Sequence, residues 1–361
     1  MDKKFKDLGE RAADICRRHC CSKRSGTAPD FPRDSQPDRP KDFPVDLWRD
    51  LGRENLMGII IPEQYKGLGL GLDALAPVTE QLVISGASMG FALTFLIHHL
   101  VCHHFIITHA DKCHRDALLP SMASGEVTAA FAVSEPGVGA HPKYLKTRAK
   151  KKDKDLIITG EKSFVTNAPL ADLFIVISVT GTKNNRNLFS AVIVPRQTSG
   201  LTVGKSMDIG RLYPCPHASL TLERCSVKQT YVTGKPDLAF ETMAIPFKRL
   251  EELMVPVIVS GAMINLFKTL GSRLPVNLQK SEAPALEAMA CRLSQMAHSS
   301  IKECMNHRNY NFPPAKTREF ARRTEQSRQY FRDLMQRAKI PPDRNQDQFD
   351  RDLTTFLGLF H

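Results

Sequence analysis

Two short segments in the middle of the chain carry residue types that could hold a planar ligand. In residues 131–140 an apolar run ends at a hydroxyl residue, Ser134, and enters a turn with two glycines. Glycines in such a turn allow positive φ angles and let backbone N–H groups approach a ligand closely. Residues 160–168 deliver an aromatic ring (Phe164) and, two residues on, a hydroxyl (Thr166). A ring beside a hydroxyl suits a planar ligand with a polar edge, although a structural turn is the favoured interpretation of each segment taken alone.

Three consecutive blocks of different secondary structure surround these segments. Apolar residues at helical spacing run through the first ~125 residues, interrupted by a proline-rich stretch. Short β-branched runs bounded by turn residues follow, which is typical of a small barrel or sandwich. Helical patterns return after Pro236 and lead into an arginine-rich end. The sequence therefore predicts an α+β multi-domain protein with an N-terminal helical domain (1–127), a middle β-barrel or sandwich domain (128–235) and a C-terminal helical bundle (236–361).

The composition excludes several classes of protein. Of the 361 residues, 42% are hydrophobic and 24% are charged, which argues against a disordered chain, a collagen-like repeat or a polytopic membrane protein. The longest apolar stretch, residues 82–97, is interrupted by small polar residues and is shorter than the ~20 residues of a membrane helix. We expect it to be a buried helix. The net charge of +12 favours anionic partners without specifying them.

Cysteine usage indicates the compartment. Nine cysteines in a chain of this length do not form a disulfide scaffold, and their number is odd. The first residues are charged and do not form an apolar leader. We expect a cytoplasmic protein, or one of the mitochondrial matrix if the source is eukaryotic.

The two segments and their order resemble the acyl-CoA dehydrogenase family. The middle domain of that family has a pattern like (Y/F)-x-(V/L)-(T/S)-E-P-x-x-G-S-D, followed by G-x-K-x-(W/F)-I-T-N. Residues 131–139 match the first pattern and residues 160–167 match the second. Residues 58–69 are similar to the family's I-P-E-x-Y-G-G-x-G loop, and residues 119–126 to its L-P-x-L-A-S-G-E approach to the β domain. The resemblance extends over residues 40–300.

The resemblance implies an FAD flavoprotein. In the family, the backbone and the hydroxyl residue of the first segment bond the edge of the flavin ring. The aromatic residue of the second segment lies against the isoalloxazine, and the threonine two residues further hydrogen-bonds the flavin. The cofactor-binding residues that this implies are Phe131, Val133, Ser134, Gly139, Ala140, Phe164, Val165 and Thr166.

The chain departs from the family pattern at the catalytic positions. Ala140-His141 stands where the family has Ser-Asp, so a hydroxyl near the cofactor is missing. The family reaction needs a carboxylate to remove the α-proton. Its Y-E-G segment near the C-terminus is absent, and the weakly similar register places Asn345 there. The family's second location for the base, early in the first C-terminal helix, leaves Glu251 and Glu252 as the candidates, with charges at the start of a helix as the other interpretation.

The C-terminal block differs as well. The family's R-x-x-F-G-x-x-(L/I)-x-x-x-Q segment, which reaches the FAD of the neighbouring subunit, and its later G-G-x-G turn are both missing. The block is also shorter than a full four-helix domain. Members of the family form homodimers or homotetramers, and this altered block bears on those contacts.

Two further clusters have both a chemical and a structural interpretation. The basic run of residues 143–154 could bind nucleic acid or the phosphates of CoA, but it lies between two predicted strands, and we favour a solvated hairpin without nucleic-acid binding. His98 with Cys102 and His99 with His103 are spaced as zinc ligands on a helix. The apolar surroundings favour structural histidines, and we predict no metal site.

The resemblance leads to a hypothesis with two alternatives. The leading hypothesis is an FAD-dependent oxidoreductase of fatty-acid metabolism that acts on the α,β CH–CH bond of an acyl-CoA or acyl-carrier thioester. An electron-transfer flavoprotein would accept the electrons. The first alternative is a non-catalytic homologue that binds flavin, an acyl thioester or a partner subunit, and the second is flavin-dependent oxygenation, since fold analogy does not rank these chemistries.

Overall fold

The N-terminal part of the protein is helical, as the apolar periodicity predicts. The computed structural model describes residues 3–22, 42–306, 314–341 and 344–359. Its first block consists of α1 (Lys3–Ser22), α2 (Val45–Arg53), α3 (Leu72–Ile84), α4 (Met89–Val101) and α5 (Lys112–Ala123), with short 3-10 turns at Leu56–Gly58 and Glu63–Tyr65 and a π-helical turn at Cys102–Ile107. α4 is the central helix, because all 13 of its residues are buried. The Ser88 side chain caps it by accepting a hydrogen bond from the Phe91 N–H at 3.1 Å.

The middle block is a single eight-stranded sheet. Its strands are β1 (Ala129–Ala132), β2 (Arg148–Lys152), β3 (Asp155–Thr166), β4 (Leu173–Lys183), β5 (Arg186–Pro195), β6 (Leu201–Val203), β7 (His217–Lys228) and β8 (Val232–Thr233). The order is β6-β7-β3-β2-β4-β5-β8, with β1 paired in parallel to β4. β2 and β3 form the antiparallel hairpin that the basic run predicts.

The sheet has two buried faces. Leu173, Ile175 and Ile177 of β4 belong to the large core shared with the helices, whereas Phe174 and Val176 belong to a second core inside the sheet. Successive side chains of a strand point to opposite faces, so this alternation follows directly from the apolar run of β4.

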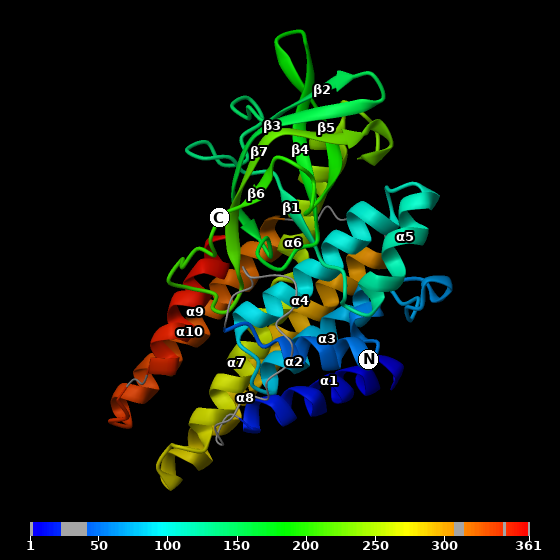
Figure 1. The fold of residues 1–361 in the computed structure, drawn as a ribbon. Helices are drawn as coiled ribbons and strands as arrows, with labels where there is room; N and C mark the ends of the chain where they lie inside the picture. Colours follow the sequence, from blue (N-terminus) through cyan, green and yellow to red (C-terminus); the bar gives the residue numbers. More distant parts are fainter. Residues whose placement is uncertain (1–2, 23–41, 307–313, 342–343, 360–361) are drawn as a thin grey trace.

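The C-terminal block returns to helix. A π-helical turn (Phe240–Ala244) leads into α6 (Ile245–Met254), followed by α7 (Pro256–Gly271), α8 (Val276–Asn306), α9 (Pro314–Arg337) and α10 (Arg344–Gly358). Figure 1 shows the sheet at one end of the molecule, with the helices of both helical blocks packed side by side beneath it and α6 next to β1. The predicted order of a helical, a sheet and a second helical domain is confirmed. The exact domain boundaries stay a prediction.

Within the residues that the structure describes, two helical stretches are long and apolar enough to cross a membrane by length and composition. They are Met89–Ile107 and Phe240–Thr269, and 89% and 72% of their most apolar windows are buried inside the protein. Core helices have this property, and residues 82–97 form parts of two such helices, α3 and α4, rather than one.

Candidate active site

The fold brings the two segments of the middle domain together. The first follows β1, and the second forms the end of β3. The backbone N–H of Ser163 donates a hydrogen bond to the carbonyl oxygen of Ser134 at 2.9 Å. Ser134 and Phe164, the hydroxyl and the ring that the sequence singles out, therefore belong to adjacent stretches of backbone.

A buried ion pair fixes this contact. Lys162 is fully buried, and its Nζ lies 2.9 Å from Oε1 of Glu135 and 3.0 Å from the carbonyl oxygen of Val133. The Glu135 carboxylate also accepts hydrogen bonds from the backbone N–H groups of Lys146 (2.6 Å) and Thr147 (2.9 Å). A buried charge that is both paired and hydrogen-bonded holds its surroundings in one arrangement. The pair therefore sets the relative position of the two segments.

Burial acts on both members of the pair. It lowers the pKa of Lys162 to about 8, against the attraction of the Glu135 carboxylate. Burial alone would raise the pKa of Glu135, but the Lys162 ammonium and the two amides outweigh it, so this pKa lies below its usual value. Both groups are charged at pH 7. Sequence reasoning assigned no role to them, although Glu135 and Lys162 stand inside the two segments.

A bulge in β3 turns Phe164 towards solvent. The register with β7 shifts between Lys162 and Val165, and Phe164 has a φ of +52°. Its ring is 62% exposed, while the Val165 side chain is buried in the inner core of the sheet. Thr166 is half-buried. Of the three predicted residues here, Phe164 and Thr166 are accessible to a ligand and the Val165 side chain is not.

The glycine turn beside these residues is open. Gly139 has a φ of +59°, and a Cβ built on it would meet no atom within 4 Å. Ala140 next to it is exposed, and Ser134 and Val133 are half-buried. An exposed ring, two hydroxyls and free space over a glycine turn together fit a planar group with a polar edge.

The ring of Phe131 packs against other aromatic rings and does not contribute to this ligand surface. It stacks on Phe105 with ring centroids 4.7 Å apart and contacts Phe247 of α6 at 4.9 Å. Phe247 stands four residues before Glu251, so both side chains lie on the same face of α6. The face of α6 that carries Glu251 is therefore the face turned towards β1.

The structure separates the two candidate bases. Glu252 forms an ion pair with Lys248, with 3.5 Å between Nζ and Oε1. Glu251 has no hydrogen-bonded or ion-pair partner for its carboxylate in the part of the chain that the structure describes. Burial raises the pKa of Glu251 to about 7, and the neighbouring Glu252 adds to the shift. A carboxyl group poised near neutral pH is suited to proton transfer.

The helix that carries these glutamates begins earlier than the sequence suggested. Glu251 and Glu252 lie in the last turn of α6, not at the start of a helix, because α6 begins at Ile245. Pro246 stands in its first turn, where a proline is tolerated because the backbone N–H there has no partner within the helix. The interpretation of both residues as charges at a helix start is therefore wrong. The other predicted location for a base, Asn345, lies in the first turn of α10, and its side chain is outside the described residues.

On the Thr166 side of the site, Cys215 precedes β7. Burial raises the pKa of the Cys215 thiol to about 12. The carbonyl oxygen of Cys215 lies 3.1 Å from Nδ1 of His217, and His217 is the cross-strand partner of Thr166. The packing of Phe247 on Phe131 is the contact that ties α6, and with it Glu251, to the first segment.

The histidines of the central helix are structural. Nε2 of His98 lies 3.3 Å from the carbonyl oxygen of Met122, and Nε2 of His99 lies 3.1 Å from that of Leu56. Burial lowers the pKa of His98 to about 3 and that of His99 to about 4. Among the described residues no group of three or more His, Cys, Asp or Glu side chains could hold a metal ion.

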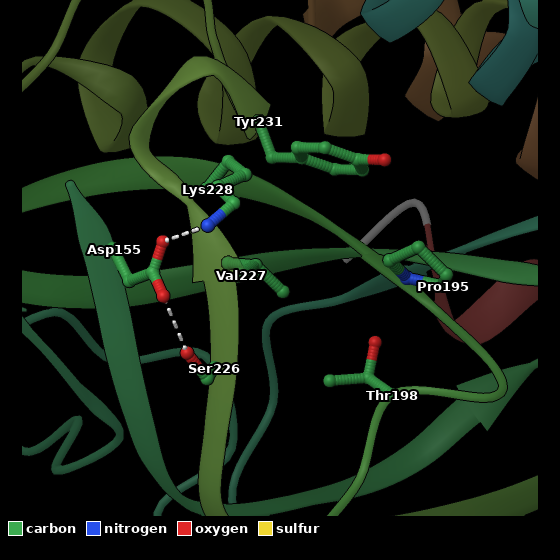
Figure 2. Close-up of a pocket in the computed structure, with 7 residues that line it drawn as sticks. All are labelled: Asp155, Pro195, Thr198, Ser226, Val227, Lys228 and Tyr231. Atoms are coloured by element: carbon green, nitrogen blue, oxygen red, sulfur yellow. Dashed lines mark hydrogen bonds and ion pairs between the residues drawn. The ribbon is translucent and has the colours of Figure 1, made fainter.

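A surface pocket lies at the far end of β3. Figure 2 shows it, with Asp155 bonded to Ser226 and Lys228; it measures about 210 Å³ and is also lined by Pro195, Thr198, Val227 and Tyr231. Asp155 begins β3 and Thr166 ends it, so the pocket and the two segments are separated by roughly 30 Å of strand. The pocket is not part of the candidate active site.

Comparison with known proteins identifies the first two blocks. The model of the acyl-CoA dehydrogenase N-terminal domain matches residues 30–126, and that of the middle domain matches residues 130–225. Together they cover more than half of the chain. The chain is 32% identical over 200 residues to the mitochondrial isovaleryl-CoA dehydrogenase of Arabidopsis thaliana, covering 55% of this chain and 48% of that protein.

A second relative acts on a carrier-bound substrate. The L-prolyl-[peptidyl-carrier protein] dehydrogenase of Pseudomonas fluorescens is 30% identical over 194 residues, covering 54% of this chain and 51% of that protein. The chain thus spans about half the length of the curated relatives that it matches.

Solved structures share the whole fold. A probable acyl-CoA dehydrogenase of Mycobacterium abscessus superposes with a TM-score of 0.79 at 17% identity, covering 99% of this chain and 94% of that one. The FAD complex of PigA gives a TM-score of 0.76 at 17% identity, covering 100% and 92%. The prolyl acyl carrier protein oxidase AnaB gives 0.68 at 17% identity, covering 91% and 86%.

Proposed function

The chain belongs to the acyl-CoA dehydrogenase family, and we propose that it is an FAD-dependent oxidoreductase acting on the α,β CH–CH bond of an acyl thioester. The single observation that carries this proposal is the half-buried carboxylate of Glu251 on the face of α6 turned towards the two segments of the middle domain. The relatives with CoA and carrier-protein substrates support an acyl-CoA or an acyl-carrier thioester.

The residues present fit FAD. Free space over Gly139, the exposed ring of Phe164 and the hydroxyls of Ser134 and Thr166 offer a surface and hydrogen bonds to a flavin ring. The backbone groups of Phe131, Val133 and Ala140 complete the proposed contacts. When bound, FAD supplies the acceptor for the hydride that leaves the β-carbon of the substrate. An electron-transfer flavoprotein is the proposed acceptor of the electrons.

Glu251 is the proposed base. Its carboxylate takes the α-proton while the C–H bond pair forms the new double bond and the β-hydride leaves. Only the ionised form can do this, and the pKa of Glu251 is about 7. The rate therefore rises with pH through about 7 and levels off above it.

The test compares two neighbouring variants. Glu251→Gln removes the base, and Glu252→Gln removes a carboxylate of the same size one residue away as the matched control. Loss of flavin absorbance is followed without oxygen after addition of a panel of acyl-CoA thioesters. We expect Glu251→Gln to slow the reaction about 100-fold or more and Glu252→Gln to leave it unchanged. Equal rates for wild type and Glu251→Gln would remove Glu251 from the mechanism.

Ala140 supports a second candidate function. Where the family has a hydroxyl beside the cofactor, this chain offers an exposed methyl group. A homologue that binds flavin or a thioester without turning it over fits that change. The same experiment decides between the two functions, because a flavin-loaded protein that no thioester bleaches would be the non-catalytic one.

A further inference from the structure

The β2–β3 hairpin presents an unneutralised row of positive charge. Its exposed cations, which we call the basic hairpin, are Arg148, Lys150, Lys151, Lys152 and Lys154. None of these side chains forms an ion pair with another described residue. Of the three carboxylates in the hairpin, that of Asp155 is bonded to Lys228 (2.9 Å) and Ser226 (3.1 Å), as Figure 2 shows. Asp153 and the exposed Glu161 are the two that remain to offset the five cations.

This row is a fixed part of the sheet, not a loose loop. β2 and β3 pair without interruption from Arg148 opposite Thr159 to Lys152 opposite Asp155. The side chains of Ala149, Leu156 and Ile158 are buried in the inner core. Like charges held at such spacing repel one another, and the carboxylates of Asp153 and Glu161 offset that repulsion only in part. An acidic partner would relieve it.

The basic hairpin is anchored on the candidate active site. The Glu135 carboxylate, next to Ser134, holds the backbone N–H groups of Lys146 and Thr147 immediately before β2. Thr159, the partner of Arg148, stands five residues before Phe164 on β3, a distance of about 17 Å along the strand. A partner seated on the basic hairpin is therefore within reach of the site through a flexible arm.

The surroundings of the row are basic as well. A hollow of about 440 Å³ beside the hairpin is lined by Lys152, Lys154 and Lys228 together with Asp153, Asp155, Ile157 and Ser226. On the side of the active site, Lys143 lies over the ring of Tyr144 at 5.7 Å, and that ring is 49% exposed. Lys143 thus extends the positive charge towards the active site, whereas the Lys228 ammonium in the hollow is paired with Asp155.

We propose that the basic hairpin is the docking surface for an acidic carrier protein that delivers the acyl group as a thioester on its flexible arm. This inference rests on the proposed function and names the substrate class of the same site. The phosphates of a free CoA are compact, whereas β2 alone extends its cations over about 13 Å. A row of that length matches the acidic surface of a small protein, and such complementarity speeds association and selects the partner.

The test reverses the charge of the row and of a matched surface. The hairpin variant is Lys150→Glu/Lys151→Glu/Lys152→Glu. The control, Lys280→Glu/Lys302→Glu/Arg318→Glu, changes the net charge equally at exposed positions of α8 and α9. Binding of a fluorescently labelled, acidic holo-acyl carrier protein is titrated by anisotropy at low and high salt. Turnover is compared between an acyl group on that carrier and the same acyl group on free pantetheine.

We expect the hairpin variant to bind the carrier at least tenfold more weakly than wild type and control, and salt to weaken wild-type binding. Turnover of the pantetheine thioester should be the same for all three proteins. Equal binding by variant and control, or no binding of the carrier by wild type at low salt, would overturn the proposal. A loss of pantetheine turnover in the hairpin variant would also overturn it, because the cations would then serve the small thioester.

Two further outcomes are informative. Displacement of the carrier from wild type by duplex DNA or anionic vesicles at lower concentration than by unlabelled carrier would assign the surface to a different polyanion and overturn the proposal. Hairpin-dependent carrier binding in a protein that no thioester reduces would support the docking surface while the dehydrogenase proposal failed.

Discussion

The middle domain and the C-terminal helices use charged side chains in opposite ways. Around the candidate site, Glu135 and Lys162 are buried and bonded to each other and to backbone groups. On the surface of the C-terminal helices, Glu319 pairs instead with Arg322 and Arg323 of the same helix. Removing one partner of a buried pair strongly lowers the free energy of unfolding, whereas an exposed pair contributes little to it.

Acid should destabilise the helical block that packs against the middle domain, through the buried histidines of α4, with the largest effect. The pKa of His98 is about 3 in the folded protein, against 6.5 for an unfolded chain. The unfolded state takes up the proton first as the pH falls, so stability is full above pH 6.5 and is lost below it. We expect a loss of about 3 kcal/mol per such histidine between pH 6.5 and pH 4, measured by urea unfolding.

The variant His98→Phe isolates this effect. It keeps a ring beside Trp48, which His98 contacts at 5.4 Å, and removes the titrating group. As the pH falls, its free energy of unfolding should decrease less steeply than that of wild type. The difference in slope corresponds to about one proton fewer taken up on unfolding. Parallel pH profiles for the two proteins would show that His98 is not neutral in the folded state.

Lys162→Met should have the next largest effect. It leaves the Glu135 carboxylate buried without its ammonium partner, at a cost of about 3 kcal/mol in the free energy of unfolding. Unfolding is followed by the fluorescence of Trp48, the only tryptophan. The double variant Lys162→Met/Glu135→Gln carries no buried charge and should recover part of the loss. A single variant as stable as wild type would refute the role of the pair.

Asp350→Asn should have the smallest effect. The Asp350 carboxylate joins α10 to α9 by accepting from Nε of Arg328 at 2.7 Å and from Arg332 at 2.9 Å. The pairs are partly exposed, and Arg328 also reaches Glu325 at 3.3 Å. We expect a loss of about 1 kcal/mol in urea unfolding. A loss as large as that of Lys162→Met would remove the contrast between the two regions.

The sequence predicted the elements and the two segments because both depend on local signals. Helical spacing marks α4, β-branched runs mark β4, and the glycine turn after Ser134 is readable as it stands. Each of these features is decided by residues within a few positions of one another.

The remaining features depend on residues that meet only in the folded chain. Glu135 and Lys162 stand 27 positions apart, and no periodicity links them. The packing of Phe131 on Phe247, which turns α6 towards the site, joins two domains. The choice between Glu251 and Glu252 needed both this face and the Lys248 ion pair.

If the two segments of the middle domain form a flavin site, the purified protein should show the visible absorbance spectrum of a bound flavin. The protein is reconstituted with FAD, freed of unbound cofactor by gel filtration, and its flavin content per chain is measured. We expect about one bound flavin per chain, with affinity lowered in the double variant Ser134→Ala/Thr166→Val. A protein that stays colourless after reconstitution would show that the two segments do not form a flavin site.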